Sequence, residues 1–213
     1  EVDNFTSPAY VARLDYRGVP GLRIGGSFYY CVNTASNSDK VATYAGVKAP
    51  LRIYTVDGQY KNKYVTARTN FVFGNLTGAT AISNKNKGLS NSSPYTRVVQ
   101  VAKKAVSYAG EVGVNLRSIC NGNKKVPVIY PFARYEYYNP QEAGEKGQLP
   151  MDKRNQVSMW TAGLNWYALP NRVVKADYMT RQIGTGKVFG KGKYNSENEF
   201  SIGIAYVGWF IKK

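Results

Sequence analysis

Charged side chains recur at alternate positions in several segments of this chain, with apolar residues between them. A period of two places side chains on opposite faces of a strand, so these charges share one face. The basic members are Arg13, Arg23, Arg68, Arg117, Arg134, Lys175 and Arg181, and the acidic members are Asp15, Asp57, Glu111, Glu136, Asp177 and Glu199. Arginine and lysine bind phosphate-like anions, and charges that line a channel set its selectivity. The pattern predicts a charged surface that lines the path of small ions.

The sequence leaves two arrangements of these charges open. In the first, four basic residues at similar heights above the nearest tight turns form a belt that attracts anions: Arg13, Arg23, Arg68 and Lys175. In the second, the arginines form salt bridges along the wall with Asp15, Asp57 and Asp177. Because this face is nearly balanced, most of the net charge of +16 falls in loops, turns and the C-terminal tail.

The composition argues against catalysis. The chain contains no histidine, which excludes Ser-His-Asp and Cys-His mechanisms and every histidine-ligated metal site. Its two cysteines, Cys31 and Cys120, cannot form a metal site alone. We therefore predict no enzyme activity and no cofactor.

Nine segments alternate polar and apolar residues, and we expect each to form a strand. The last segment shows the pattern best, because Phe200, Ile202 and Ile204 fall on one face while Ser201 and Gly203 fall on the other. The expected strands are 9–16, 21–32, 51–60, 64–74, 105–118, 127–138, 157–168, 172–182 and 198–211.

Short and long connections alternate between these strands. The short ones contain Gly, Pro or Asn, which supply the backbone angles of tight turns, and they are 17–20, 61–63, 119–126 and 169–171. The long ones are polar and span 33–50, 75–104, 139–156 and 183–197. This rhythm is typical of bacterial outer-membrane barrels, with turns in the periplasm and loops outside the cell. Because it places Cys31 and Cys120 at opposite rims, we expect both thiols to be free.

The apolar face carries the aromatic residues that membrane interfaces collect. The chain has 18 Tyr, 8 Phe and 3 Trp, and amphipathic rings are enriched at membrane–water boundaries. A pI near 9.8 is also typical of nucleic-acid binding. However, the aromatic residues follow the apolar face at a period of two, so we expect no nucleic-acid partner. We predict instead an all-β, antiparallel, up-and-down transmembrane β-barrel, with long loops extracellular and the C-terminus periplasmic.

The number of strands bears on how much of a barrel is present. Single-chain bacterial barrels have an even number of strands, and nine is odd. We therefore expect residues 1–213 to form one β-barrel domain that is the C-terminal portion of a longer barrel. The alternative is one overlooked strand, near Thr43–Val47 or Thr96–Val101.

Several stretches resemble the C-terminal half of Bacteroidetes porins related to the phosphate-selective porin O and P family. The matching stretches, in order, are 9–16, 19–27, 131–140, 161–166 and 174–178. The resemblance implies a porin of roughly sixteen strands, trimeric, that passes small anionic solutes across the bacterial outer membrane. Its other partners would be outer-membrane lipid and lipopolysaccharide.

The predicted function is thus passive diffusion of small solutes, with a preference for anions, through an outer-membrane pore. One alternative is a non-conducting barrel subunit of a surface or secretion complex. Another is a soluble β-sandwich adhesin, although such a fold gives no reason for short and long connections to alternate.

Overall fold

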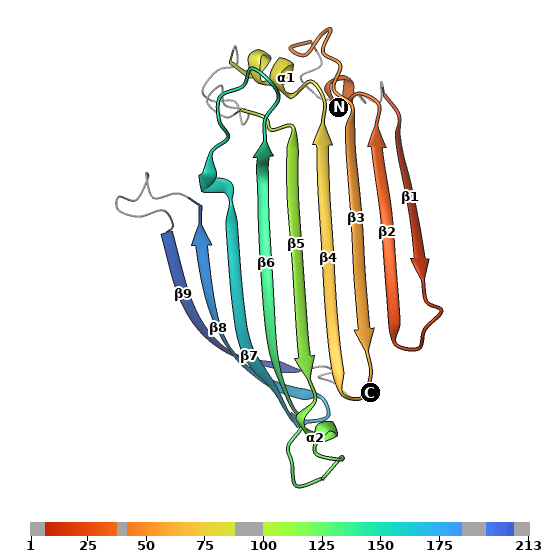
Figure 1. Cartoon of the computed structure of the whole chain (residues 1–213), viewed down its shortest axis with the longest axis vertical. Coiled ribbons are helices and arrows are strands. Elements are labelled where there is room, and N and C mark those ends of the chain that lie inside the picture. Colours follow the sequence, from red (N-terminus) through yellow and green to blue (C-terminus); the bar gives the residue numbers. More distant parts are fainter. Residues whose placement is uncertain (1–6, 38–41, 88–99, 185–194, 207–213) are drawn as a thin grey trace, which may run out of the picture.

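A computed structural model describes residues 7–37, 42–87, 100–184 and 195–206 of the chain. Nine strands form one antiparallel sheet in which each strand pairs with its neighbours in sequence (Figure 1). The strands are β1 (Ala9–Tyr16), β2 (Leu22–Cys31), β3 (Leu51–Lys61), β4 (Val65–Leu76), β5 (Lys104–Val114), β6 (Ile129–Ala143), β7 (Val157–Leu169), β8 (Arg172–Ile183) and β9 (Asn195–Tyr206). The up-and-down order predicted from the sequence is confirmed.

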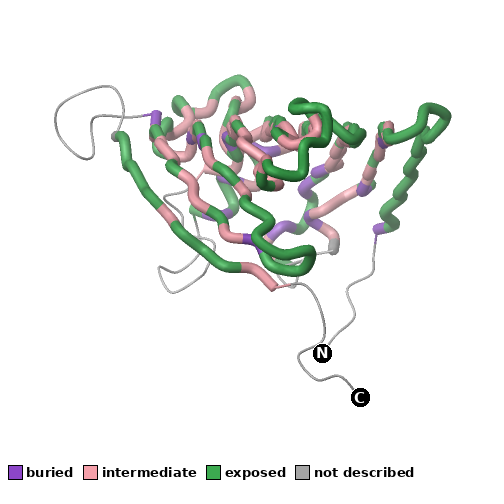
Figure 2. The backbone as a smooth tube through the Cα atoms, turned by 90° about the horizontal axis from the view of Figure 1, so that it is seen from below, coloured by how far each residue is buried: buried purple, intermediate pink, exposed green. Residues whose placement is uncertain are grey.

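The sheet curves but does not close. Seen from below, its strands form an open trough (Figure 2). Among the described residues, β1 pairs only with β2, and β9 pairs only with β8. The structure therefore shows a nine-stranded curved sheet and not a closed barrel.

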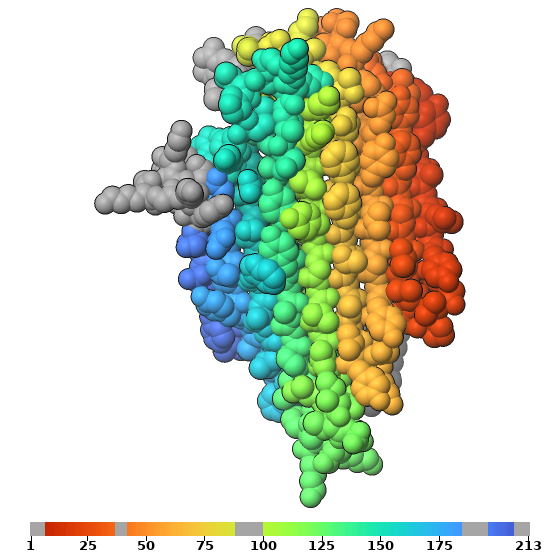
Figure 3. All heavy atoms as spheres, viewed as in Figure 1, coloured from red at the N-terminus to blue at the C-terminus, as the bar shows by residue number. Residues whose placement is uncertain are grey.

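Alternation gives the two faces of the sheet different chemistry. Most of the exposed aromatic and aliphatic side chains of the strands gather on one face: Tyr10, Leu14, Tyr16, Ile24, Phe28, Tyr54, Val56, Tyr60, Phe71, Tyr108, Val112, Trp160, Leu164, Trp166, Tyr178, Phe200, Ile202 and Ile204. This face is convex, and the connection between β5 and β6 projects beyond its lower end (Figure 3). The register expected from the sequence is confirmed at Trp160, Leu164, Trp166, Ile202 and Ile204.

Three strand ends lie three or more residues from their predicted positions. The sixth strand was expected to end at residue 138, but β6 continues to Ala143 and shortens the connection that follows. The fifth strand was expected to reach residue 118, but β5 ends at Val114 and α2 (Leu116–Ile119) follows. Asn115 ends the strand, because its side chain accepts a hydrogen bond from the backbone N–H of Ser118 and caps this turn. The last strand begins at Asn195, three residues earlier than expected, and residues 207–211 lie outside the described part of the chain.

Neither candidate for an overlooked strand forms one within the described residues. Residues 43–46 form turns and residue 47 is irregular, and Tyr44 and Val47 are buried rather than arranged at a period of two. Residues 100 and 101 are not in a strand, and 96–99 lie outside the described residues. Cys31 and Cys120 are not joined by a disulfide, as expected: Cys31 is buried at the loop end of β2, and Cys120 is exposed in the β5–β6 connection.

The long connections at the upper rim pack together into a structure that we call the loop cap, formed by the described residues of 32–50, 77–103 and 144–156 (Figure 1). Its core contains Ala35, Tyr44, Val47 and Ala49, with Leu76 of β4 and Ile82 of α1 (Ala79–Asn86) packed against them. Two 3₁₀ turns, Thr34–Asn37 and Lys153–Asn155, complete its regular structure. None of the described helices is long and apolar enough to span a membrane.

Candidate functional site

The concave face carries charged residues from β1 to β6 that we call the charged ladder: Arg13, Asp15, Arg23, Asp57, Arg68, Glu111, Arg134 and Glu136. The strand register places them in adjacent cross-strand rows. One row runs from Asp15 through Asp57 to Glu136, and the next runs from Arg23 through Arg68, Glu111 and Arg134. Arg13 lies in a third row, on the other side of the Asp15 row. Opposite residues in an antiparallel sheet share a face, so alternation alone brings these eight side chains together.

The first four residues of the ladder form a closed ion-pair cluster. Arg13 contacts the carboxylates of Asp15 and Asp57, each at 2.8 Å. Arg23 contacts Asp57 at 2.8 Å and Asp15 at 3.6 Å. Two guanidinium groups and two carboxylates therefore compensate one another across three strands.

A second cluster lies two strands further on. Arg134 of β6 donates two hydrogen bonds to one carboxylate oxygen of Glu111, at 2.9 and 2.6 Å. It also lies 3.7 Å from Glu136. One guanidinium group thus serves two carboxylates, which leaves this cluster with an excess of one negative charge.

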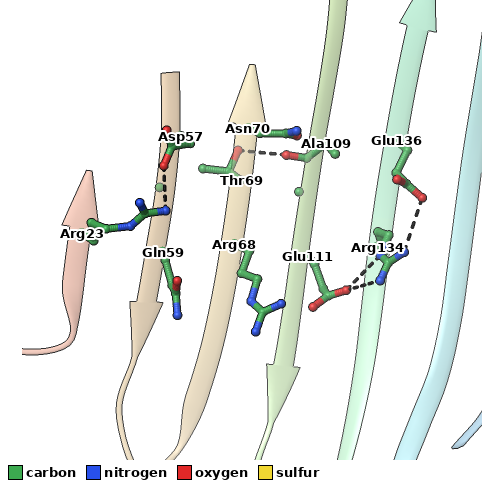
Figure 4. Close-up of a pocket in the computed structure, with 12 residues that line it drawn as sticks. Arg23, Asp57, Gln59, Arg68, Thr69, Asn70, Ala109, Glu111, Arg134 and Glu136 are labelled. Carbon is green, nitrogen blue, oxygen red and sulfur yellow. Dashed lines mark hydrogen bonds and ion pairs between the residues drawn. The ribbon is translucent and has the colours of Figure 1, made fainter. Parts of the chain in front are cut away.

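Arg68 lies between these two clusters. Figure 4 shows its guanidinium group near Gln59 and Glu111 without a dashed contact to either residue. Within the part of the chain that the structure describes, it makes no ion pair. Its charge balances the excess of the second cluster at a distance, so the ladder is neutral as a whole. Arg68 is nevertheless available to a passing anion.

A pocket of about 320 Å³ lies along this part of the concave face. Its charged lining residues are Arg23, Asp57, Arg68, Glu111, Arg134 and Glu136. Side chains from β2 to β6 line it together, because the sheet curves toward this face (Figures 2 and 4). The pocket is open, polar and charged with both signs, which suits hydrated small solutes better than an apolar ligand.

The remaining predicted residues lie outside β1–β6, although the register places Arg181 and Glu199 in the same two cross-strand rows as the ladder. Arg117 is outside the sheet, on α2, where its Nε donates to the backbone carbonyl of Val126 at 2.6 Å. Its predicted place on a strand is therefore wrong, because the strand ends at Asn115. Arg181 of β8 pairs with Glu197 of β9, a partner that the sequence analysis missed because it began the last strand at residue 198.

Three further residues lie on the strands β8 and β9. Asp177 accepts a hydrogen bond from Ser201 at 3.0 Å. Glu199 is exposed and lies opposite Met179. Lys175 lies opposite Asn165 and Gly203 and makes no ion pair among the described residues. The structure therefore favours salt bridges for Arg13, Arg23, Arg134 and Arg181, and leaves Arg68 and Lys175 as unpaired cations.

The loop cap contains a second polar site, which the sequence analysis did not identify. The carboxylate of Glu145 accepts hydrogen bonds from the backbone N–H groups of Gly78 and Thr80, at 2.8 and 2.9 Å. Gly78 precedes α1 with φ of 78° and offers no side-chain cap, so Glu145 supplies the cap from another loop. Burial acts to raise the pKa of Glu145, but these two donors and nearby Lys103 outweigh it and hold this pKa below its usual range.

Tests for metal binding and for known relatives give no assignment. Among the described residues, no group of three or more His, Cys, Asp or Glu side chains is placed to hold a metal ion. The chain matches no protein-family model and no curated protein. We therefore infer the function from the two faces of the sheet and from the charged ladder.

Proposed function

We propose that this sheet is part of a transmembrane β-barrel of the bacterial outer membrane, and that its concave face lines a pore for passive diffusion of small solutes. The observation that carries the proposal is the division between the faces. Exposed apolar residues cover the convex face, where Ile204 is 79 % and Ile202 is 69 % exposed, while the charged ladder occupies the concave face. Such a division is typical of strands between lipid and a water-filled lumen.

The dimensions of the apolar band support this placement. On the convex side of β5, the residues from Val106 to Val114 span eight positions without a charged residue. At a rise of roughly 3.3 Å per residue this is about 26 Å along the strand, enough to cross most of the ~25 Å apolar band of outer-membrane barrels when the strand is tilted. The exceptions on the concave face, Val11, Tyr138 and Tyr167, lie near the strand ends.

We infer from the open edges of the sheet that further strands complete the barrel. In a bilayer every backbone N–H and C=O group needs a partner inside the protein, so the outer edges of β1 and β9 require further strands. A larger barrel, in which these nine strands form one portion, meets this requirement. The resemblance to the phosphate-selective porin O and P family points to about sixteen strands and a trimer, and both remain part of the proposal.

The charged ladder supports only a weak preference for anions. Its charges cancel, and Arg68 is the member available to solutes. A charge that ions approach to about 5 Å changes their energy by about 0.8 kcal/mol in water. Screening at about 0.1 M salt roughly halves this energy, and charge reversal counts it twice for the anion and twice for the cation. We therefore expect R68E to lower the ratio of anion to cation permeability by at most about tenfold.

The test compares two charge reversals in planar bilayers, made in the complete barrel of which these nine strands form one portion. We expect R68E to lower the ratio of anion to cation permeability without unfolding the barrel, whereas R23E also breaks the ion pairs with Asp57 and Asp15 and should destabilise the sheet. The effect should shrink between 0.1 M and 1 M salt, where the Debye length falls from about 10 Å to about 3 Å. A matched reversal in the β5–β6 connection, K124E, controls for net charge.

Failure to conduct would favour the second candidate, a barrel that serves as a non-conducting subunit of a surface or secretion complex. The pairing of most ladder charges is the observation that favours it, because paired charges also suit a purely structural wall. A complete barrel that folds and inserts into bilayers without conductance would contradict the pore. Conductance with unchanged selectivity in R68E would contradict the role of Arg68 alone.

A further inference from the structure

A row of four residues crosses the convex face at the upper edge of the apolar band. The strand register aligns Tyr30 of β2, Arg52 of β3, Asn75 of β4 and Lys104 of β5. We call these four residues the upper polar row. Below it, the convex positions of the same four strands carry no charged residue: Phe28, Gly26, Ile24 and Leu22; Tyr54, Val56, Gly58 and Tyr60; Phe73, Phe71, Thr69, Ala67 and Val65; Val106, Tyr108, Gly110, Val112 and Val114.

Both basic residues of this row are free to bind an anion. Within the described residues, neither Arg52 nor Lys104 makes an ion pair. The Arg52 guanidinium lies 5.5 Å from the centre of the Tyr30 ring, which holds the side chain against the convex face. Lys104 is exposed. Because one strand separates β3 from β5, their backbones are about 10 Å apart, or two strand spacings.

We propose that the upper polar row binds the phosphate groups of a membrane lipid whose acyl chains lie against the aromatic residues below it. The proposal rests on the membrane placement argued above. Phe28 and Tyr54, directly beneath the row, have ring centres 5.0 Å apart and form an apolar surface. The cations are on an exposed convex face and not in a pocket, so a ligand with both a phosphate and an apolar tail fits better than a free phosphate. A headgroup with two phosphates can reach both cations.

The test measures lipid retention by native mass spectrometry of the full chain in detergent. The probes are diphosphorylated lipid A, phosphatidylglycerol and phosphatidylcholine at equal concentration. We expect the protein to retain lipid A in preference to phosphatidylcholine. Each basic residue near a lipid surface contributes about fivefold to affinity, so retention should fall roughly tenfold or more in the R52Q/K104Q variant.

The matched control is K124Q/K125Q, which removes the same charge from exposed positions at the opposite rim. We expect it to retain lipid A like the unaltered protein. Equal losses in both variants, or no loss in R52Q/K104Q, would overturn the proposal. Displacement of lipid A by about 10 mM inorganic phosphate would also overturn it, because the row would then be a simple anion site.

The lipid site and the proposed pore can each fail without the other. A protein that inserts and conducts but shows no preference for lipid A refutes the lipid site and leaves the pore standing. A protein that retains lipid A through Arg52 and Lys104 without conductance supports the lipid site and contradicts the pore.

Discussion

The sheet and the loop cap are held together in different ways. The sheet joins consecutive strands by backbone hydrogen bonds and leaves large apolar side chains exposed, with Leu14 at 81 %. The loop cap buries side chains from connections that are far apart in the sequence, and Ala49 and Ala79 are fully buried there. The difference indicates that the cap carries its own small core. Under the proposed function, the sheet would be stabilised instead by an apolar medium around its convex face.

The largest expected effect tests whether the convex face of the sheet contacts lipid. Ile202 and Ser201 are neighbours on β9 but lie on opposite faces, and Ile202 is midway along the exposed apolar positions of that strand. We expect I202R to lower the free energy of unfolding in vesicles by about 2–4 kcal/mol, the cost of a basic residue near the bilayer midplane.

The matched variant is S201R, which places the same charge on the concave face beside Asp177. We expect it to change this free energy far less. Urea unfolding in lipid vesicles, followed by tryptophan fluorescence, measures both. Equal losses in the two variants would show that the convex face does not contact lipid.

A smaller effect is expected for the core of the loop cap. The hydroxyl group of Tyr44 donates a 2.6 Å hydrogen bond to Oδ1 of Asn86, and both residues are buried. We expect Y44F to destabilise the cap by about 1–2 kcal/mol, because Asn86 is left with a buried, unpaired acceptor. Hydrogen exchange of the α1 amides measures this loss locally.

Tyr54 provides the control, since it is 43 % exposed on the convex face. The Y54F variant should leave exchange in α1 unchanged. If Y44F and Y54F gave the same exchange rates, the cap would not hold a core of its own.

The same contrast explains which parts of the structure could be predicted from the sequence. The strands and their register follow from a period of two and from adjacent pairing, so residues such as Trp160 and Ile202 could be placed on the correct face. Tyr44 and Asn86 are 42 residues apart, and Glu145 and Gly78 are 67 apart. No local sequence pattern predicts such contacts, because they depend on how three loops fold against each other.

The candidate site contains residues that could be placed from the sequence and residues that could not. Alternation predicted which charged residues share the concave face, and the structure brings Arg13, Arg23 and Asp57 together there. It could not decide which cation stays unpaired, because that depends on side-chain geometry across several strands. Arg117 was misplaced because Asn115 caps a helical turn, a local competition that the alternating pattern did not reveal.

The smallest expected effect concerns pH and the cap that Glu145 gives to α1. The pKa of Glu145 in the folded protein lies below the usual 4.5, so the charged carboxylate stabilises the folded loop cap. This contribution is complete above the pKa of the unfolded chain and is lost as the pH falls through the lower, folded pKa. Asp152, whose pKa is lowered by hydrogen bonds from Arg154, titrates in the same direction.

We therefore expect hydrogen exchange in α1 to speed up as the pH falls below about 4.5, after correction for the intrinsic exchange rate. The E145Q variant should lose about 0.5–1 kcal/mol of protection at neutral pH and should show a flatter pH dependence, because the charge at the helix N-terminus is gone. The control is D152N, which alters the neighbouring Asp152–Arg154 pair and leaves the helix cap intact. A D152N variant with the same flattened profile as E145Q would assign the pH response to that ion pair and not to the helix cap.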